Sequence, residues 1–194
     1  IMAGIVSFRE KIPHIDKLSK ALEKIDGITS VILNVNPEKT NVILGNKTII
    51  LSGNSYITDK ILDKTFKIGS KSFFQVNPYN VGNLYKTALD FLDLTKDDIL
   101  FDIYCGTGTI GLCGADKVNK LVGVEIIPEA IEDAKFNARE NDIQNARFYC
   151  LDATEFAGKA AKEGMKADVV ILDPPRKGLT EELISTVAEK LNPQ

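Results

Sequence analysis

The sequence of 194 residues has few of the residue types that mark specialised classes of protein. It contains no tryptophan, one histidine and three cysteines. It has no run of about 18 apolar residues that could cross a membrane as a helix, and Ile1–Lys11 lacks the apolar core of a signal peptide. An odd number of cysteines without CxxC spacing argues against a disulfide framework, so we expect a cytoplasmic protein without a membrane partner.

The remaining composition is that of an ordinary globular chain, with 44% hydrophobic and 26% charged residues. A chain of this length can bury a core without disulfides or a metal, which excludes disordered and collagen-like classes. The net charge of −3 is unevenly distributed, because residues 1–75 carry +4 and residues 76–194 carry −7. A polyanionic partner would favour the basic first part.

Residues 1–72 are predicted to form a small α+β module. Apolar residues recur at helical spacing in Pro13–Ile25 and predict an amphipathic helix. Short β-branched runs predict a small antiparallel sheet with a tight turn at Gly45-Asn46. These runs are Val31–Val35, Asn41–Leu44, Lys47–Leu51 and Thr65–Phe73.

Residues 73–194 alternate between helices and strands, which predicts an α/β fold with a doubly wound parallel sheet. The expected strands are Ile99–Tyr104, Leu121–Glu125, Arg147–Cys150 and Asp168–Leu172. The expected helices are Pro78–Leu94, with its apolar face at Leu84, Ala88, Phe91 and Leu92, then Pro128–Glu140, Ala153–Glu163 and Glu181–Lys190. We expect the spatial order 3-2-1-4, with the fourth strand at an edge through which two copies could form a homodimer.

A glycine-rich loop follows the first of these strands and opens a helix. Gly106, Gly108 and Gly111 spell G-x-G-x-x-G, and Glu125 ends the next strand. Glycines at this place let a ligand approach the backbone closely, and an acid at the end of the next strand suits ribose hydroxyls. A nicotinamide dinucleotide and S-adenosylmethionine both fit this pattern.

Three features favour S-adenosylmethionine. Asp102, just before the loop, suits the ammonium group of that cofactor and would repel a pyrophosphate. A helix precedes the first strand, and the fourth strand ends in Asp173-Pro-Pro-Arg176. A carboxylate stiffened by two prolines at this edge of the sheet can accept a hydrogen bond from a polar ring beside the methyl donor. Gln75, after two phenylalanines, offers both a donor and an acceptor.

Four motifs, in this order, resemble those of the RNA uracil-5-methyltransferase family, whose members make 5-methyluridine in ribosomal and transfer RNA. The motifs are Ser72-Phe-Phe-Gln-Val-Asn77, Asp102-Ile-Tyr-Cys-Gly-Thr-Gly108, Gly123-Val-Glu125 and Leu172-Asp-Pro-Pro-Arg-Lys-Gly178. The resemblance covers about residues 5–194. It implies a Rossmann-like S-adenosylmethionine-dependent methyltransferase domain, with a partial parallel sheet, at residues 73–194. It also implies a central, RNA-facing module at residues 1–72.

The resemblance implies cofactor contacts at Gln75, Tyr104, Glu125 and Asp173, to which the glycine pattern adds Gly106 and Gly108. The implied substrate is RNA, and 23S ribosomal RNA is favoured over transfer RNA. We expect no metal in this part of the protein.

Methylation at carbon 5 of uracil needs a covalent nucleophile, because that carbon is itself a poor nucleophile. The resemblance implies a Cys thiolate that adds to carbon 6 and a Glu that removes the proton from carbon 5. In the family both lie after the Asp-Pro-Pro-Arg motif, so we expect them beyond Gln194 and expect this chain to be an inactive fragment. Cys105, Cys113 and Cys150 are predicted to be structural.

Alternative interpretations remain. The chain could be a non-catalytic cofactor-binding or RNA-binding module, and a Ser-Cys-Asn-Pro segment following Gln194 would argue against this. It could be a nicotinamide oxidoreductase, which a comparison of NADH and S-adenosylmethionine binding would decide. It could also be a methyltransferase that acts on transfer RNA, on a small molecule or on a protein.

Overall fold

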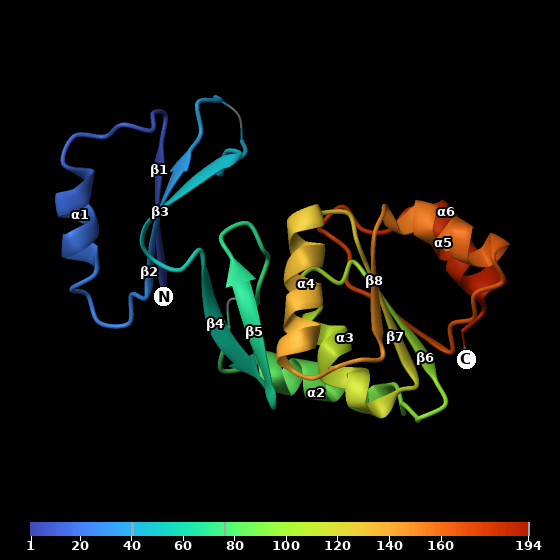
Figure 1. Cartoon of the computed structure of the whole chain (residues 1–194). Helices are drawn as coiled ribbons and strands as arrows, with labels where there is room; N and C mark the ends of the chain where they lie inside the picture. The colour runs from blue at the N-terminus through green and yellow to red at the C-terminus, as the bar shows by residue number, and fades with distance from the viewer. Residues whose placement is uncertain (40, 76, 194) are drawn as a thin grey trace. The chain divides into compact units, whose positions relative to one another are not determined.

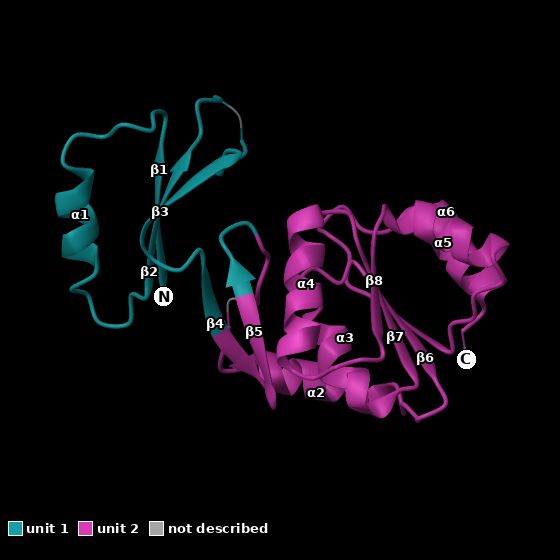
Figure 2. Cartoon of the chain, in the orientation of Figure 1, with its two compact units in different colours: residues 1–58, 68–71 teal, residues 59–67, 72–194 magenta. Residues whose placement is uncertain are grey.

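The computed structural model describes residues 1–39, 41–75 and 77–193 (Figure 1). The chain forms two compact units, one made of residues 1–58 and 68–71 and the other of residues 59–67 and 72–194 (Figure 2). Within the described residues, no helix is both long enough and apolar enough to span a membrane. The division into functional domains at residue 72 stays a prediction.

The first unit contains a three-stranded mixed sheet. Strands β1 (Met2–Ser7), β2 (Ser30–Val35) and β3 (Lys47–Gly53) lie in that order, with β1 parallel and β3 antiparallel to β2. Helix α1 (Ile15–Leu22) forms the crossover between the parallel strands and confirms the predicted helix. The predicted antiparallel pairing is confirmed for β2 and β3. The sheet as a whole is mixed, because β1, a strand that the sequence pattern did not reveal, pairs in parallel across this crossover.

The predicted strand at Asn41–Leu44 is wrong, since this segment lies in the connection between β2 and β3. The side-chain amide of Asn36 donates to two carbonyls of the segment, at 2.7 and 3.0 Å. The side-chain amide of Asn34 forms two hydrogen bonds with the backbone of Gly45. It accepts from the N–H at 2.7 Å and donates to the carbonyl at 3.0 Å. Asparagine side chains therefore bond backbone groups that a neighbouring strand would otherwise have paired.

A two-stranded hairpin follows, formed by β4 (Tyr56–Ile61) and β5 (Lys64–Gly69). Residues 59–67 of this hairpin belong to the second unit. Ile61 and Phe66 are fully buried there, in the same apolar cluster as the helix that follows the hairpin. The hairpin therefore contributes to the core beside the parallel sheet.

The second unit is built on a four-stranded parallel sheet. Its strands are β6 (Ile99–Ile103), β7 (Lys120–Glu125), β8 (Ala146–Cys150) and β9 (Val169–Leu172). The order β8-β7-β6-β9 confirms the predicted order 3-2-1-4. Among the described strands β9 lies at one edge, and dimer formation through it stays a prediction.

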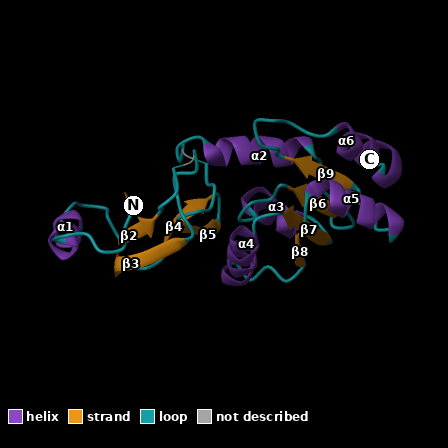
Figure 3. Ribbon diagram, turned by 90° about the horizontal axis from the view of Figure 1, so that it is seen from above, coloured by secondary structure: helices purple, strands orange, loops and turns teal. Residues whose placement is uncertain are grey.

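Helices cover both faces of this sheet. They are α2 (Val81–Phe91), α3 (Thr109–Gly114), α4 (Pro128–Glu140), α5 (Ala153–Lys162) and α6 (Glu181–Ser185), which continues as a π-helix over Thr186–Leu191. Figure 3 shows α3 and α4 on one side of the sheet and α5 and α6 on the other. Successive side chains of β6 point to opposite faces of the sheet. Leu100 therefore belongs to the apolar cluster that contains Ile61 and Phe66, and Phe101 belongs to a second apolar cluster.

Helix α2 buries a different face from the one predicted. Val81, Tyr85 and Leu89 are buried, whereas Leu84 is 55% and Phe91 85% exposed. The buried residues recur at intervals of four, which is also helical spacing. Tyr85 can lie inside because its hydroxyl has a hydroxyl partner at 2.9 Å, a contact that apolar periodicity cannot reveal.

Gly123, in the middle of β7, generates a prediction about packing. A Cβ atom there would lie 2.5 Å from Cδ1 of Phe148 and 3.1 Å from Sγ of Cys105. We expect Gly123→Ala to lower the free energy of unfolding by about 1–3 kcal/mol in guanidinium titrations. Gly158→Ala in α5 is the matched control, because a Cβ there meets nothing within 4 Å. The control variant should leave the free energy of unfolding unchanged or raise it. Equal decreases of the free energy of unfolding in both variants would contradict the packing argument.

Candidate cofactor site

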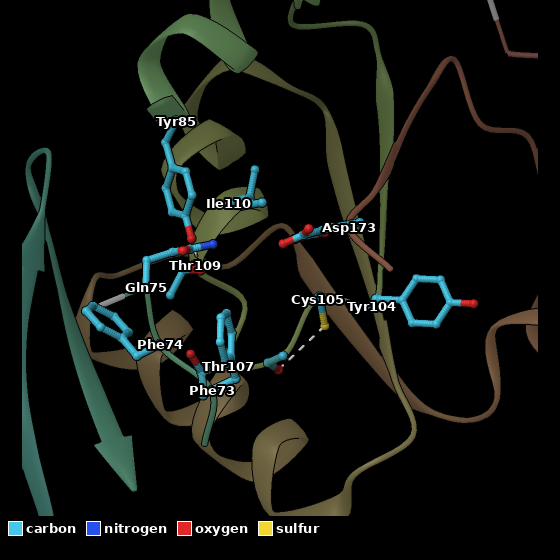
Figure 4. A pocket seen from close by; sticks show the side chains of 12 residues that line it. Phe73, Phe74, Gln75, Tyr85, Tyr104, Cys105, Thr107, Thr109, Ile110 and Asp173 are labelled. Carbon is cyan, nitrogen blue, oxygen red and sulfur yellow. Dashed lines mark hydrogen bonds between the residues drawn. The ribbon is translucent and has the colours of Figure 1, made fainter. Parts of the chain in front are cut away.

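A pocket opens in the second unit near the carboxyl ends of β6 and β9 (Figure 4). Its walls come from the segment before α2, from α2 itself, from the glycine loop between β6 and α3, and from the residue after β9. The lining residues are Phe73, Phe74, Gln75, Tyr85, Asp102, Tyr104, Cys105, Gly106, Thr107, Thr109, Ile110 and Asp173. In open parallel sheets this edge is where ligands bind.

Four of the six residues predicted to contact a cofactor line this pocket: Gln75, Tyr104, Gly106 and Asp173. Figure 4 shows the Gln75 amide and the Asp173 carboxylate directed toward one another, whereas the ring of Tyr104 points away from both. The tyrosine therefore contributes its backbone, more than its ring, to the part of the pocket that these two side chains face.

The other two predicted residues support the loop. Glu125 follows Val124 at the end of β7, and its Oε2 accepts from the N–H of Gly106 at 3.2 Å. Its Oε1 accepts from the N–H groups of Ile126 and Ile127 at 2.8 and 3.0 Å, which fixes the carboxylate. Gly108 precedes α3 with a φ of 81°, and a Cβ there would lie 3.0 Å from a leucine side chain.

The glycine loop holds an unusual run of left-handed backbone conformations. Tyr104, Gly106 and Gly108 have φ angles of 70°, 54° and 81°. Glycine adopts this region freely, but a tyrosine does so at a cost of about 1–2 kcal/mol. A Cβ at Gly106 would meet nothing within 4 Å. The backbone at Gly106 therefore faces open space that a ligand can occupy.

Asp102, on β6, is the most unusual ionisable group of the pocket. It is 1% exposed, its Oδ2 accepts from the N–H of Gly111 at 2.9 Å, and its Oδ1 has no partner among the described residues. Burial raises the pKa of its carboxyl to about 7, the Gly111 bond opposes this shift, and the charges of Asp173 and Glu125 add to it. A cationic donor in the pocket would satisfy Oδ1 and lower this pKa.

The two buried cysteines of the second unit, Cys105 and Cys113, are poorly suited to act as thiolates. Burial, together with the charges of Asp102 and Glu125, raises the pKa of the Cys105 thiol well above its ordinary value. Burial raises the pKa of Cys113 to about 12. Cys150 is exposed and contacts the carbonyl of Ile126 at 3.6 Å, at the end of β8.

Sequence reasoning missed several polar groups of the pocket. The hydroxyl of Thr107 is buried without a partner among the described residues, and Tyr85 and Thr109 share a buried hydrogen bond. In the sequence, only the position of Thr107 between two loop glycines indicates that it lies at the pocket. No pattern in the sequence indicates that Tyr85 lies there. Within the described part of the chain, no cluster of three or more His, Cys, Asp or Glu could hold a metal ion.

Comparisons with known proteins agree on one family. A family model described as tRNA (uracil-5-)-methyltransferase matches residues 14–191. An "uncharacterized RNA methyltransferase" of Lactobacillus johnsonii is 47% identical over 97% of this chain and 42% of its own length. One of Clostridium tetani is 45% identical over 97% of this chain and 41% of its own length. The chain thus spans about two fifths of the length of these curated relatives.

A solved structure covers nearly the whole chain as well. The crystal structure of Pyrococcus abyssi tRNA (uracil-54, C5)-methyltransferase in complex with S-adenosyl-L-homocysteine superposes with a TM-score of 0.75 and 26% identity. The match covers 97% of this chain and 44% of that chain. Residues of both compact units are therefore included in the similarity.

The buried carboxyl of Asp102 predicts a specific pH dependence of stability. Its pKa is about 7 in the folded chain, and about 4 is expected when the chain is unfolded. The folded state therefore holds a proton that the unfolded state has lost across this window, so stability falls as pH rises. We expect the free energy of unfolding to fall relative to Asp102→Asn by up to about 1.4 kcal/mol per pH unit between pH 4 and 7. Denaturant titrations across pH check this, and a constant difference would contradict it.

Proposed function

Since the chain belongs to the tRNA (uracil-5-)-methyltransferase family, as its four motifs predicted, we propose that it carries the cofactor-binding part of an S-adenosylmethionine-dependent RNA methyltransferase that forms 5-methyluridine. The observation that carries the proposal is Oδ1 of Asp102, which has no hydrogen-bond partner in the part of the chain that the structure describes and is buried beside the open glycine loop. A cofactor with both a cationic ammonium and a ribose fits this arrangement of groups.

The residues that line the pocket, together with Glu125 behind the loop, suit the parts of S-adenosylmethionine one by one. Asp102 would accept from the ammonium group, and Glu125, already oriented by three backbone N–H groups, would accept from the ribose hydroxyls. Gly106 leaves room for the ligand to pass close to the backbone, whereas Gly108 lets the loop pack closely on the start of α3. The bound cofactor would supply an activated methyl group, while Gln75 and Asp173 present polar atoms that face one another in the pocket.

A nicotinamide dinucleotide fits the same pocket less well. Its pyrophosphate carries negative charge, and the carboxyl groups of Asp102 and Asp173 line the pocket, with Glu125 bonded to the loop behind it. Bringing a pyrophosphate to these groups would add like charges in a partly desolvated site. The charge of the pocket therefore favours the cationic cofactor.

The acceptor that we propose is a uridine in RNA. The basic charge of residues 1–75 supports an RNA contact in that part of the chain, because phosphates attract Lys and Arg. The motifs favoured 23S ribosomal RNA, while the matched family model and the Pyrococcus abyssi structure are named for transfer RNA. Both RNAs therefore belong in any assay, and a cytoplasmic location is proposed with them.

The proposed function predicts which ligand the chain binds and how tightly. Titration calorimetry of the 194-residue chain with S-adenosylhomocysteine should show binding, and NADH should bind much more weakly. Glu125→Ala should weaken S-adenosylhomocysteine about 10- to 100-fold, because a hydrogen bond from a ligand to a charged group is lost. Glu189→Ala, an exposed carboxylate on the C-terminal π-helix, is the control and should leave affinity unchanged. A preference for NADH would contradict the proposed cofactor.

The proposed function also predicts that residues 1–194 alone transfer no methyl group to RNA. The buried thiols of Cys105 and Cys113 have raised pKa values, so neither supplies the thiolate that addition to carbon 6 of uracil requires. Cys150 is exposed at the end of β8 and is not among the residues that line the pocket. A tritiated methyl-transfer assay with unmodified ribosomal and transfer RNA should give only background. Turnover that Cys105→Ala abolishes would show that this cysteine is a nucleophile after all.

A further inference from the structure

Helix α4 and its C-terminal cap present a line of three polar side chains to the hairpin strand β5. Asp133, Asn137 and Asn141 follow one another at intervals of four residues, and Asn137 is 0% exposed. We call these residues the α4 polar stripe. Polar groups buried at such positions require hydrogen-bond partners, and the stripe finds them in segments distant in the sequence.

Two members of the stripe bond the backbone of β5 as a neighbouring strand would. Asn141 accepts from the N–H of Thr65 at 2.9 Å and donates to its carbonyl at 2.7 Å. Asn137 accepts from the N–H of Lys67 at 2.7 Å and donates to its carbonyl at 3.3 Å. Because alternate residues of a strand present their N–H and C=O groups to the same edge, the two asparagines cover the edge of β5.

Asn137 makes one contact that Asn141 does not. Its Nδ2 also donates to the carbonyl of Thr107 at 3.1 Å, in the glycine loop that lines the pocket. The amide orientation is fixed by its surroundings, since Oδ1 faces an N–H group and Nδ2 faces two carbonyls. One buried amide thus joins the loop to the hairpin strand.

Asp133, one turn earlier on α4, extends this connection to a second segment of the pocket wall. It accepts from Oγ of Ser72 at 2.8 Å and pairs with Nζ of Lys67 at 3.0 Å. Ser72 directly precedes Phe73–Gln75, another segment that lines the pocket. The stripe therefore contacts both the glycine loop and the start of this second segment.

We propose that Asn137 is a positioning residue for the glycine loop. Thr107 lies between Gly106 and Gly108, both with positive φ, and the loop begins with Tyr104 in the same region. A loop in such conformations needs external bonds to hold it there. Asn137 fixes the Thr107–Gly108 peptide group and so holds Gly106 and Thr107 at the pocket. Asn141, by contrast, bonds the backbone of β5.

The matched pair Asn137→Ala and Asn141→Ala tests this proposal without any ligand. Each variant removes two bonds to β5, but only Asn137→Ala removes the bond to the loop. Hydrogen exchange should be measured at the amide of Gly108, which donates to the carbonyl of Cys105 at 2.8 Å. We expect exchange there to be about tenfold faster in Asn137→Ala, the factor that one hydrogen bond provides, and unchanged in Asn141→Ala. Equal exchange in the two variants would overturn the proposal.

A second arm measures affinity for S-adenosylhomocysteine and rests on the proposed function. Asn137→Ala should weaken binding about tenfold, and Asn141→Ala less than twofold. If the unaltered chain binds no S-adenosylhomocysteine, the proposed cofactor is wrong, and the exchange measurement still decides the role of Asn137. If Asn137→Ala does not fold, Asn137→Asp with Asn141→Asp as its control replaces the pair. Aspartate keeps the acceptor for the Lys67 N–H, and faster loop exchange only in Asn137→Asp is then the expected result.

Discussion

The pocket of the second unit is built around one buried carboxyl group, that of Asp102, at the carboxyl end of a central strand. Removing a carboxylate from water is costly, and a single N–H bond from Gly111 offsets only part of that cost. The surroundings leave little room for change, because a Cβ at Gly111 would lie 2.8 Å from the Asp102 carboxylate. A group kept in so unfavourable an environment is typical of a binding site, where the ligand supplies the missing partner.

The glycine loop and the α4 polar stripe complete the site from different directions. The loop depends on positive φ angles, and it is tied to the end of β7 by Glu125 and, through Asn137, to the hairpin strand. Glu125 has two uses in this account, because it orients the loop and keeps acceptor capacity for a ribose. The geometry of the proposed cofactor site is therefore shared between the sheet, whose strands place the acids, and helix α4, which contributes no lining residue to the pocket.

The sequence predicts most of what is repetitive in this structure and little of what depends on individual side chains. The order of the parallel strands and the place of the glycine loop follow from alternation of helices and strands, and both are confirmed. The segment Asn41–Leu44 has strand-like composition, but the amide of Asn36 bonds its carbonyls instead. Burial of Tyr85 needs a hydroxyl 24 residues away, and the Asn137 bond joins residues 30 apart. Periodicity carries no information on such pairs.

A crystal structure of the 194-residue chain with S-adenosylhomocysteine tests the proposed site most directly. We expect the ammonium nitrogen of the ligand to lie about 2.7–3.2 Å from Oδ1 of Asp102 and the ribose hydroxyls to lie at the same distance from Glu125. The ligand would then lie against Gly106, with little change in the loop. A ligand bound elsewhere, or bound here with Oδ1 of Asp102 still unpartnered, would contradict the central claim that this carboxylate is buried to receive the cofactor.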